Sequence, residues 1–277
     1  MRTTTLPNGD AIPKLGLGTW GMGERSGDAA AEARALAHGL DRGVGLIDTA
    51  EMYGDGGAEA VIAQALAGRR DRPYIVSKVY PHNASRQGVI AACERSLRRL
   101  KLERIDLYLL HWRGPTPFAE TISGFETLIA DGKIGAWGAS NLNADDMAEL
   151  WAAAGGAACQ TNQVLYNLVR RWPEGRLLPA MAGRGTPLMA YSPLEQGGLA
   201  RAPALRRIAA AAGLDPIQLA LAWTLARDDV FAVPKSARPE RIDGFLAAAE
   251  LTLSPDIMAA LDAAFPAPEA SAAMEML

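Results

Sequence analysis

The sequence predicts an α/β fold, a (β/α)8 TIM barrel that carries an N-terminal β-hairpin and an extra C-terminal helix. Short apolar runs alternate with helical segments eight times along the chain. Strands separated by helices imply right-handed crossovers, and therefore a parallel sheet. The length of 277 residues also suits one such barrel.

The predicted hairpin occupies residues 3–14, where Asn8-Gly9 supplies the positive φ angles of a tight turn. The strands of the barrel are then expected at residues 15–20, 45–49, 74–79, 105–111, 134–139, 159–163, 187–191 and 231–234. The helices are expected at residues 28–42, 58–67, 86–100, 118–131, 144–153, 175–184, 203–212, 216–227 and 239–248, with a last helix at 255–264. Residues 1–277 are therefore expected to form one domain, whose tail at 266–277 is either a mobile flap or disordered.

An open, doubly wound sheet is the alternative α/β fold. It would require a glycine-rich phosphate-binding turn between the first strand and the first helix. Residues 16–21 contain three glycines, but their spacing differs from that of the dinucleotide fingerprint and no clear helix start follows them. The closed barrel is therefore preferred.

Composition argues against several classes of protein. The formal net charge is −3, and no run of Lys or Arg resembles a nucleic-acid-binding arm. Cys93 and Cys159 are the only cysteines, which fits a reducing compartment rather than a disulfide framework. The first residues lack the apolar core of a signal peptide, and no stretch approaches roughly 18 uninterrupted apolar residues. We therefore expect a cytoplasmic protein that binds neither nucleic acid nor membrane.

Four ionisable side chains fall at or just after the ends of three consecutive predicted strands. Asp48 ends the second strand and Tyr53 follows in its loop, while Lys78 ends the third strand and His111 the fourth. Because the carboxyl ends of barrel strands share one mouth, these side chains should converge. A free phenol has a pKa of about 10, and a lysine ammonium beside it is expected to lower that pKa. The set suits protonation of an oxygen atom, with Asp48 holding Lys78 and His111 orienting a carbonyl.

Each of these residues alone has a structural explanation, since strand ends often carry ion pairs and buried histidines. Their joint occurrence on three successive strands favours a functional site. A metal-dependent barrel hydrolase is the first alternative, and it needs His and carboxylate ligands at close spacing. The chain contains only His38, His82 and His111, with no His-x-His pair. No metal site is therefore predicted.

Six segments resemble, in the same order, the aldo-keto reductase family. They are residues 45–54 (GLIDTAEMYG), 77–78 (SK), 109–112 (LLHW), 138–141 (GASN), 190–194 (AYSPL) and 233–236 (VPKS). The resemblance spans residues 4–265 and is especially close to bacterial members that reduce methylglyoxal and other aldehydes. It implies NADPH-dependent reduction of small aldehydes or ketones to alcohols. It also implies that Tyr53 is the proton donor, that Asp48 and Lys78 tune it, and that His111 places the carbonyl.

The same resemblance implies the residues that bind NADP(H). Ser140, Asn141 and Gln163 are similar to the groups that bind the nicotinamide carboxamide, and Tyr191 to the ring that stacks on the nicotinamide. The other implied cofactor residues are Thr19, Trp20, Asp48, Ser192, Pro193, Leu194, Gln196, Lys235, Ser236 and Arg241. Two cations near a ribose 2′-phosphate, Lys235 and Arg241, would favour NADP over NAD.

The candidates for the substrate pocket are Trp20, Met52, Tyr53, His111 and Trp112. The expected partner is a small carbonyl compound, and the expected state is a monomer or a weak homo-oligomer. The alternative function is a non-catalytic or redox-sensing module that keeps the fold and the cofactor pocket. The presence of all four implied catalytic residues disfavours it.

One segment departs from the family pattern. Gly244-Phe245 stands where the family usually has Glu-Asn, whose polar groups contact the adenine. We therefore expect the adenine contacts to differ in this chain, while the nicotinamide end keeps its implied residues.

Overall fold

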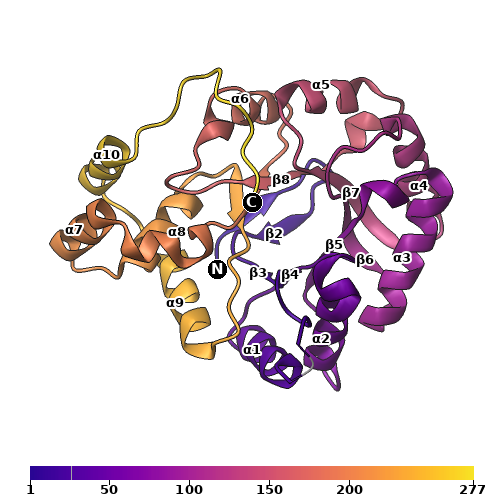
Figure 1. The fold of residues 1–277 in the computed structure, drawn as a ribbon, viewed down its shortest axis with the longest axis horizontal. Helices are drawn as coiled ribbons and strands as arrows, with labels where there is room; N and C mark the ends of the chain where they lie inside the picture. The colour runs from indigo at the N-terminus through magenta and orange to yellow at the C-terminus, as the bar shows by residue number, and fades with distance from the viewer. Residues whose placement is uncertain (26) are drawn as a thin grey trace.

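The computed structural model describes residues 1–25 and 27–277, which form a barrel of eight parallel strands inside a ring of helices (Figure 1). The strands are β3 (Leu17–Gly18), β4 (Leu46–Asp48), β5 (Tyr74–Val79), β6 (Ile105–Leu110), β7 (Ile134–Ser140), β8 (Asn162–Leu165), β9 (Leu188–Tyr191) and β10 (Val230–Ala232). Neighbours in the sheet are neighbours in the sequence, and every pair is parallel. The predicted fold class is confirmed.

The barrel closes between β3 and β10. Leu15 forms a parallel bridge with Ala232, and the Gly16 N–H donates a hydrogen bond of 2.9 Å to the Ala232 carbonyl. The two segments lie so close that a Cβ atom on Gly18 would be 2.7 Å from the Val233 carbonyl oxygen. Glycine at position 18 therefore allows the barrel to close.

The surrounding helices are α1 (Ala29–Asp41), α2 (Gly57–Leu66), α3 (Arg86–Leu100), α4 (Phe118–Ala130), α5 (Ala144–Ala152), α6 (Leu177–Ala182), α7 (Pro203–Ala212), α8 (Pro216–Ala226), α9 (Pro239–Glu250) and α10 (Pro255–Ala264). Short 3₁₀ helices lie in the loops at η1 (Tyr53–Gly56), η2 (Pro81–Asn83), η3 (Gly156–Ala158), η4 (Trp172–Glu174) and η5 (Glu195–Arg201). No single helix among the described residues is long and apolar enough to cross a membrane, although two strongly bent pairs, α7 with α8 and α9 with α10, reach that length and apolarity together.

The sixth strand lies later in the chain than the predicted 159–163. Gln160 already donates a hydrogen bond to the Trp137 carbonyl on the neighbouring strand. The regular ladder of β8 continues beyond Gln163 to Leu165, because Val164 and Leu165 extend the apolar run. Gln163 therefore lies inside the strand rather than at its end.

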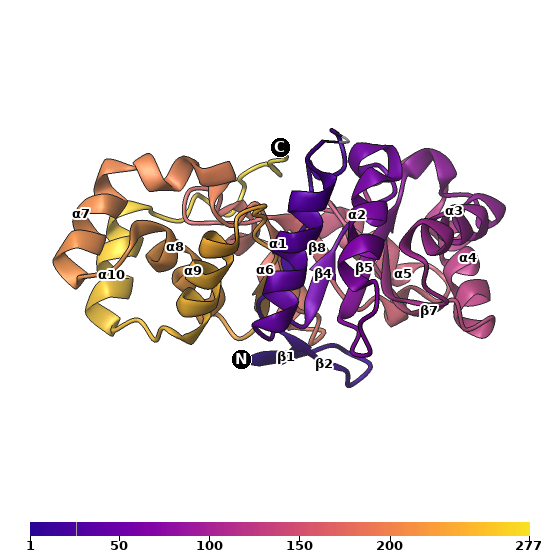
Figure 2. The ribbon, with the colours of Figure 1, turned by 90° about the horizontal axis from the view of Figure 1, so that it is seen from below.

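The hairpin covers the amino-terminal end of the barrel. Strands β1 (Thr3–Thr5) and β2 (Ala11–Pro13) are antiparallel, and Gly9 has a φ of 92° in the predicted turn. Leu6 and Ile12 are fully buried and belong to the hydrophobic cluster inside the barrel. Figure 2 shows the hairpin at one end of the barrel and the C terminus of the chain at the other.

The barrel interior changes from apolar to polar along the strands. Side chains of a strand point alternately to its two faces, so residues two apart share the interior. Leu46 and Val76 belong to the inner hydrophobic cluster. The next inward positions on the same strands are Asp48 and Lys78, and their side chains meet inside the barrel. The apolar cluster thus lies directly below these polar groups in the barrel interior.

Candidate active site

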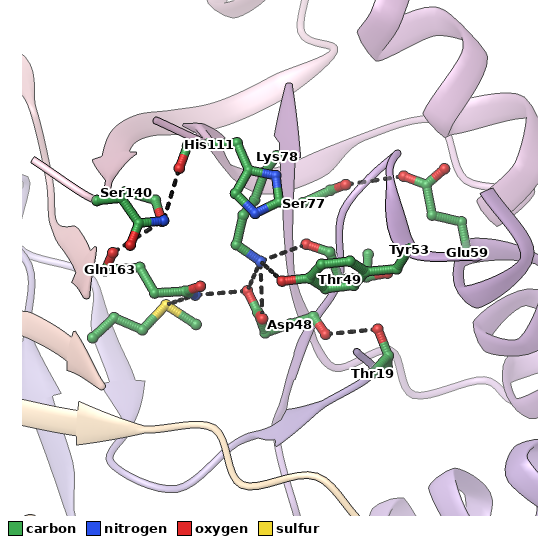
Figure 3. A network of polar contacts seen from close by, with 12 residues as sticks. Thr19, Asp48, Thr49, Tyr53, Glu59, Ser77, Lys78, His111, Ser140 and Gln163 are labelled. Atoms are coloured by element: carbon green, nitrogen blue, oxygen red, sulfur yellow. Dashed lines mark hydrogen bonds and ion pairs between the residues drawn. The ribbon is translucent and has the colours of Figure 1, made fainter. Parts of the chain in front are cut away.

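Lys78 is the centre of a buried polar network (Figure 3). Its side chain is 0% exposed, and Nζ donates hydrogen bonds to Asp48 Oδ1 at 2.8 Å and Oδ2 at 2.9 Å. Nζ also lies 2.8 Å from the Thr49 carbonyl oxygen and 3.2 Å from the Tyr53 hydroxyl. The structure therefore brings Asp48, Tyr53 and Lys78 into direct contact.

Burial dominates the protonation of this network. It raises the pKa of Asp48 and lowers the pKa of Lys78, while the attraction between the two groups opposes both shifts. Burial, followed by the negative charge of Asp48, raises the pKa of Tyr53 well above its usual value of 10.0. The expectation that Lys78 lowers this pKa is therefore wrong for this structure, because Asp48 compensates the ammonium charge while desolvation of the phenol remains. Tyr53 keeps its proton at neutral pH.

His111 lies beside Tyr53 and is neutral. The two rings meet edge to face, with centroids 5.8 Å apart and planes at 75°. Burial, with the positive charge of Lys78, lowers the pKa of His111 well below its usual value of 6.5. Among the described residues, Nδ1 of His111 has no hydrogen-bond partner. A neutral imidazole keeps one N–H donor, which suits it to orient a carbonyl oxygen.

Gln163 of β8 and Asn141, which directly follows β7, complete the network from across the barrel. The Gln163 carboxamide donates hydrogen bonds of 2.8 Å to Asp48 Oδ1 and 2.9 Å to the sulfur of Met189. Asn141, which has a φ of 54°, donates 3.1 Å bonds to the His111 carbonyl and to Ser140 Oγ. Because the N–H groups of Gln163 and Asn141 have partners inside the protein, their amide oxygens are the atoms that remain for a ligand.

The network opens into a cleft of about 920 Å³ at the carboxyl ends of the strands. The cleft contains every predicted substrate-pocket residue: Trp20, Met52, Tyr53, His111 and Trp112. It is also lined by most of the predicted cofactor residues: Trp20, Asp48, Asn141, Gln163, Tyr191, Ser192, Pro193, Leu194, Gln196, Lys235, Ser236 and Arg241. One continuous cavity thus joins the two predicted sites.

Two predicted cofactor residues do not line this cleft. Thr19 is fully buried, and its hydroxyl donates a 3.0 Å hydrogen bond to the backbone carbonyl of Asp48. Ser140 is also fully buried and donates a 2.9 Å bond to the Gln163 carbonyl. Both hydroxyls therefore bond to the backbone of strands that carry site residues, β4 for Thr19 and β8 for Ser140.

The cleft also contains a group of cations. Lys235, Arg238 and Arg241 line it, and none of the three forms an ion pair with residues 1–25 or 27–277. Unpaired cations in a cleft suit an anionic ligand such as a phosphate. These cations suit the phosphates of a dinucleotide, and the Tyr191 ring lines the same cleft. Arg238 was absent from the prediction, although it lies in the same segment as Lys235 and Arg241.

The C-terminal tail crosses the mouth of the barrel (Figure 1). Arg170 pairs with Glu275 of the tail and, at 2.8 Å, with Glu195 of η5. Met276 and Leu277 line the cleft. The prediction missed both residues, although they form an apolar end to an otherwise small-residue tail.

No group of three or more His, Cys, Asp or Glu residues in the described part of the chain is arranged to hold a metal ion.

Comparisons with known proteins agree with this architecture. Residues 14–265 match the model of the Aldo/keto reductase family. The chain is 47% identical over 272 residues to methylglyoxal reductase YeaE of Escherichia coli (strain K12), covering 96% of both proteins. It is 33% identical over 240 residues to glyoxal reductase of Bacillus subtilis (strain 168), covering 87% of this chain and 84% of that protein.

Solved structures show the same similarity. An aldo/keto reductase from Klebsiella pneumoniae, crystallised in complex with NADP and acetate, is 44% identical with a TM-score of 0.96, over 100% of this chain and 99% of that one. An aldo-keto reductase of the same organism, solved in complex with NADPH, matches with the same identity, coverage and TM-score. The ordered motifs, the closed barrel and these matches together establish that the chain belongs to the aldo/keto reductase family.

Proposed function

We propose that this protein reduces small aldehydes or ketones to alcohols with NADPH, and that its substrates resemble methylglyoxal. The observation that carries the proposal is the contact of 3.2 Å between the Tyr53 hydroxyl and Lys78 Nζ at the base of the cleft. A protonated phenol beside a buried ammonium is suited to give a proton to an oxygen atom. The relatives named as methylglyoxal and glyoxal reductases support the substrate class.

Different residues of the cleft bind different parts of the cofactor. Lys235 and Arg241 hold the ribose 2′-phosphate, and the Tyr191 ring packs on the nicotinamide. The amide oxygens of Asn141 and Gln163 accept hydrogen bonds from the nicotinamide carboxamide, since their N–H groups are already paired. The NADP and NADPH complexes of the Klebsiella relatives support this choice of cofactor.

Proton transfer is the step that the protein's own residues perform. When bound, NADPH supplies a hydride to the carbonyl carbon. Tyr53 donates its proton to the carbonyl oxygen, so that its own O–H bond breaks and the O–H bond of the alcohol forms. Lys78 stabilises the phenolate as it appears, which is an interaction stronger in the transition state than before it. The neutral His111 donates a hydrogen bond that orients the same oxygen.

Asp48 has a positioning role in this scheme. Its two oxygens hold Lys78 Nζ at 2.8 and 2.9 Å, so the ammonium cannot turn away from Tyr53. Gln163 in turn fixes Asp48 from the far side of the barrel. A catalytic group held this firmly needs little reorganisation when the charge on Tyr53 develops.

The walls of the substrate end favour compact carbonyl compounds. Trp20, Met52 and Trp112 present apolar surface to the cleft, and the Trp20 side chain is 54% exposed at the mouth. An open apolar wall binds a small aldehyde through its carbon skeleton, while the polar network below it binds the oxygen.

A panel of small aldehydes and ketones, including methylglyoxal, tests the proposal. Turnover is followed by the loss of NADPH absorbance, and NADPH binding is measured separately by fluorescence titration. We expect several small aldehydes to be reduced. Binding of NADPH without oxidation by any carbonyl compound would instead support a non-catalytic cofactor-binding module.

A further inference from the structure

Helices α8 and α9 pack side by side next to the barrel (Figures 1 and 2). The cleft extends to residues of both helices. Gln218 on α8 and Gly244 on α9 both line it. A Cβ atom placed on Gly244 would lie 3.8 Å from Nε2 of Gln218. Because residue 244 has no side chain, the carboxamide of Gln218 is left uncovered on the side that faces α9.

The Gln218 carboxamide is also free to bind a ligand. Its backbone N–H is fixed by a 3.1 Å hydrogen bond from Gln218 to Asp215 Oδ1 at the start of α8. Among residues 1–25 and 27–277, no hydrogen bond involves its side chain. A rigid helix terminus thus presents an unpaired donor and an unpaired acceptor to the cleft.

The other groups at this part of the cleft have only one kind of hydrogen-bonding atom in their side chains. Asp215 and Glu240 carry carboxylates, which only accept, whereas Arg238 and Arg241 carry guanidinium groups, which only donate. Phe245 is 3% exposed and has no polar side-chain atom. Gln218 combines a donor and an acceptor in one planar group.

Adenine has the matching pattern. Its 6-amino group is a donor that stands beside a ring-nitrogen acceptor on each of its two edges, and a glutamine carboxamide pairs with such an edge through two hydrogen bonds. The planar guanidinium group of Arg238 suits stacking on the purine face. We propose that Gln218 recognises the adenine of the dinucleotide through the opening that Gly244 leaves. This inference rests on the proposed function, since it assumes NADPH in the cleft.

Direct binding measurements test this assignment without turnover. The dissociation constants of NADPH and of an analogue whose adenine 6-amino group is replaced by hydrogen are measured by calorimetry. The analogue loses one hydrogen bond to Gln218, so wild-type protein should bind it several-fold more weakly, on the order of fivefold. Gln218→Ala should bind NADPH on the order of tenfold more weakly than the wild type does, and should bind the two ligands equally.

Two further variants complete the test, one at Gln218 and one at a control position. Gln218→Met preserves the length of the side chain without polar amide atoms, and it should also bind the two ligands equally. Gln64→Ala, on an exposed position of α2, should bind both ligands as the wild type does. The assignment would be overturned if Gln218→Ala or Gln218→Met still bound NADPH more tightly than the analogue, or if the wild type bound the two ligands equally. Either outcome would leave the proposed function intact. Failure of the wild type to bind NADPH would overturn both.

Discussion

The hydroxyl of Tyr53 lies 3.2 Å from Nζ of Lys78, and the same ammonium donates a hydrogen bond of 2.8 Å to Asp48. Before any reaction the ammonium charge is balanced by Asp48, and the buried phenol retains its proton. Loss of that proton places a new negative charge beside Lys78. In the proposed mechanism, this arrangement favours proton release from Tyr53 at the moment when a substrate oxygen accepts the proton.

Replacement of Tyr53 by Phe should nearly abolish carbonyl reduction. General acid catalysis typically contributes about 10²–10⁴-fold to a rate, so kcat should fall by about that factor. The dissociation constant of NADPH, measured by fluorescence, should stay within a small factor of the wild-type value. Tyr74→Phe is a matched control, because its hydroxyl is buried outside the cleft and unpaired among the described residues. Full turnover by Tyr53→Phe would remove Tyr53 from the mechanism.

Breaking the pair between Asp48 and Lys78 should cost stability as well as activity. Both side chains are almost completely buried, and removal of one partner of a buried pair typically costs about 3–5 kcal/mol. We expect that loss in the free energy of unfolding for Asp48→Asn and for Lys78→Met, measured by urea denaturation. The double variant should lose less than the sum, since it leaves no uncompensated charge. Strictly additive losses would contradict this coupling.

An exposed pair provides the comparison for that experiment. Arg227 and Asp229 are 2.8 Å apart, but their side chains are 41% and 31% exposed. Exposed pairs typically contribute about 0–1 kcal/mol, so Asp229→Asn should change the free energy of unfolding by no more than that.

Lys235→Ala should weaken the use of NADPH far more than the use of NADH. A hydrogen bond to a charged group is worth about 1.5–3 kcal/mol, which corresponds to an increase of roughly 10- to 150-fold in KM for NADPH. KM for both cofactors is measured with the same aldehyde. Arg34→Ala, which removes an exposed cation from α1, should leave the ratio unchanged. An unchanged ratio in Lys235→Ala would show that this ammonium does not meet the 2′-phosphate.

His111 should make the protein less stable at mildly acidic pH. Its pKa in the folded state lies well below 6.5, so the unfolded chain binds a proton that the folded protein excludes. The stability that comes from keeping His111 neutral is complete above the pKa of the unfolded state. It is lost as the pH falls toward the pKa of the folded state. Between about pH 7.5 and pH 5.5 the wild type should lose about 1 kcal/mol more than His111→Gln. Equal losses in urea denaturation at the two pH values would contradict this account.

Gly244→Ala should stabilise the protein. Glycine in the interior of a helix costs about 0.5–1 kcal/mol relative to alanine, and the nearest atom to the added Cβ lies at 3.8 Å, an ordinary contact distance. The free energy of unfolding should rise by about that amount. In Gly39→Ala on α1 the added Cβ would lie 2.6 Å from a methyl carbon of Leu17, so this variant should gain less or lose stability. Destabilisation of Gly244→Ala would show that the opening beside it is filled.

The sequence by itself determined the barrel and the convergence of its polar residues. The alternation of strands and helices requires parallel strands, and parallel strands of a barrel end at one mouth. The two-residue period of a strand then places Asp48 above Leu46 and Lys78 above Val76. These features depend on spacing along the chain, which the sequence contains directly.

The tertiary structure alone decided which polar groups are buried and what they contact. The direction of the Tyr53 pKa shift depends on desolvation by surrounding segments, which no local pattern encodes. The hydrogen bond from Gln163 to Asp48 joins residues on opposite sides of the barrel, and Thr19 bonds to the backbone of Asp48 instead of lining the cleft. Gln218 gains its proposed role only because a gap in the packing of α9 lies against it. Burial and contact arise between segments distant in sequence, and only the folded chain defines them.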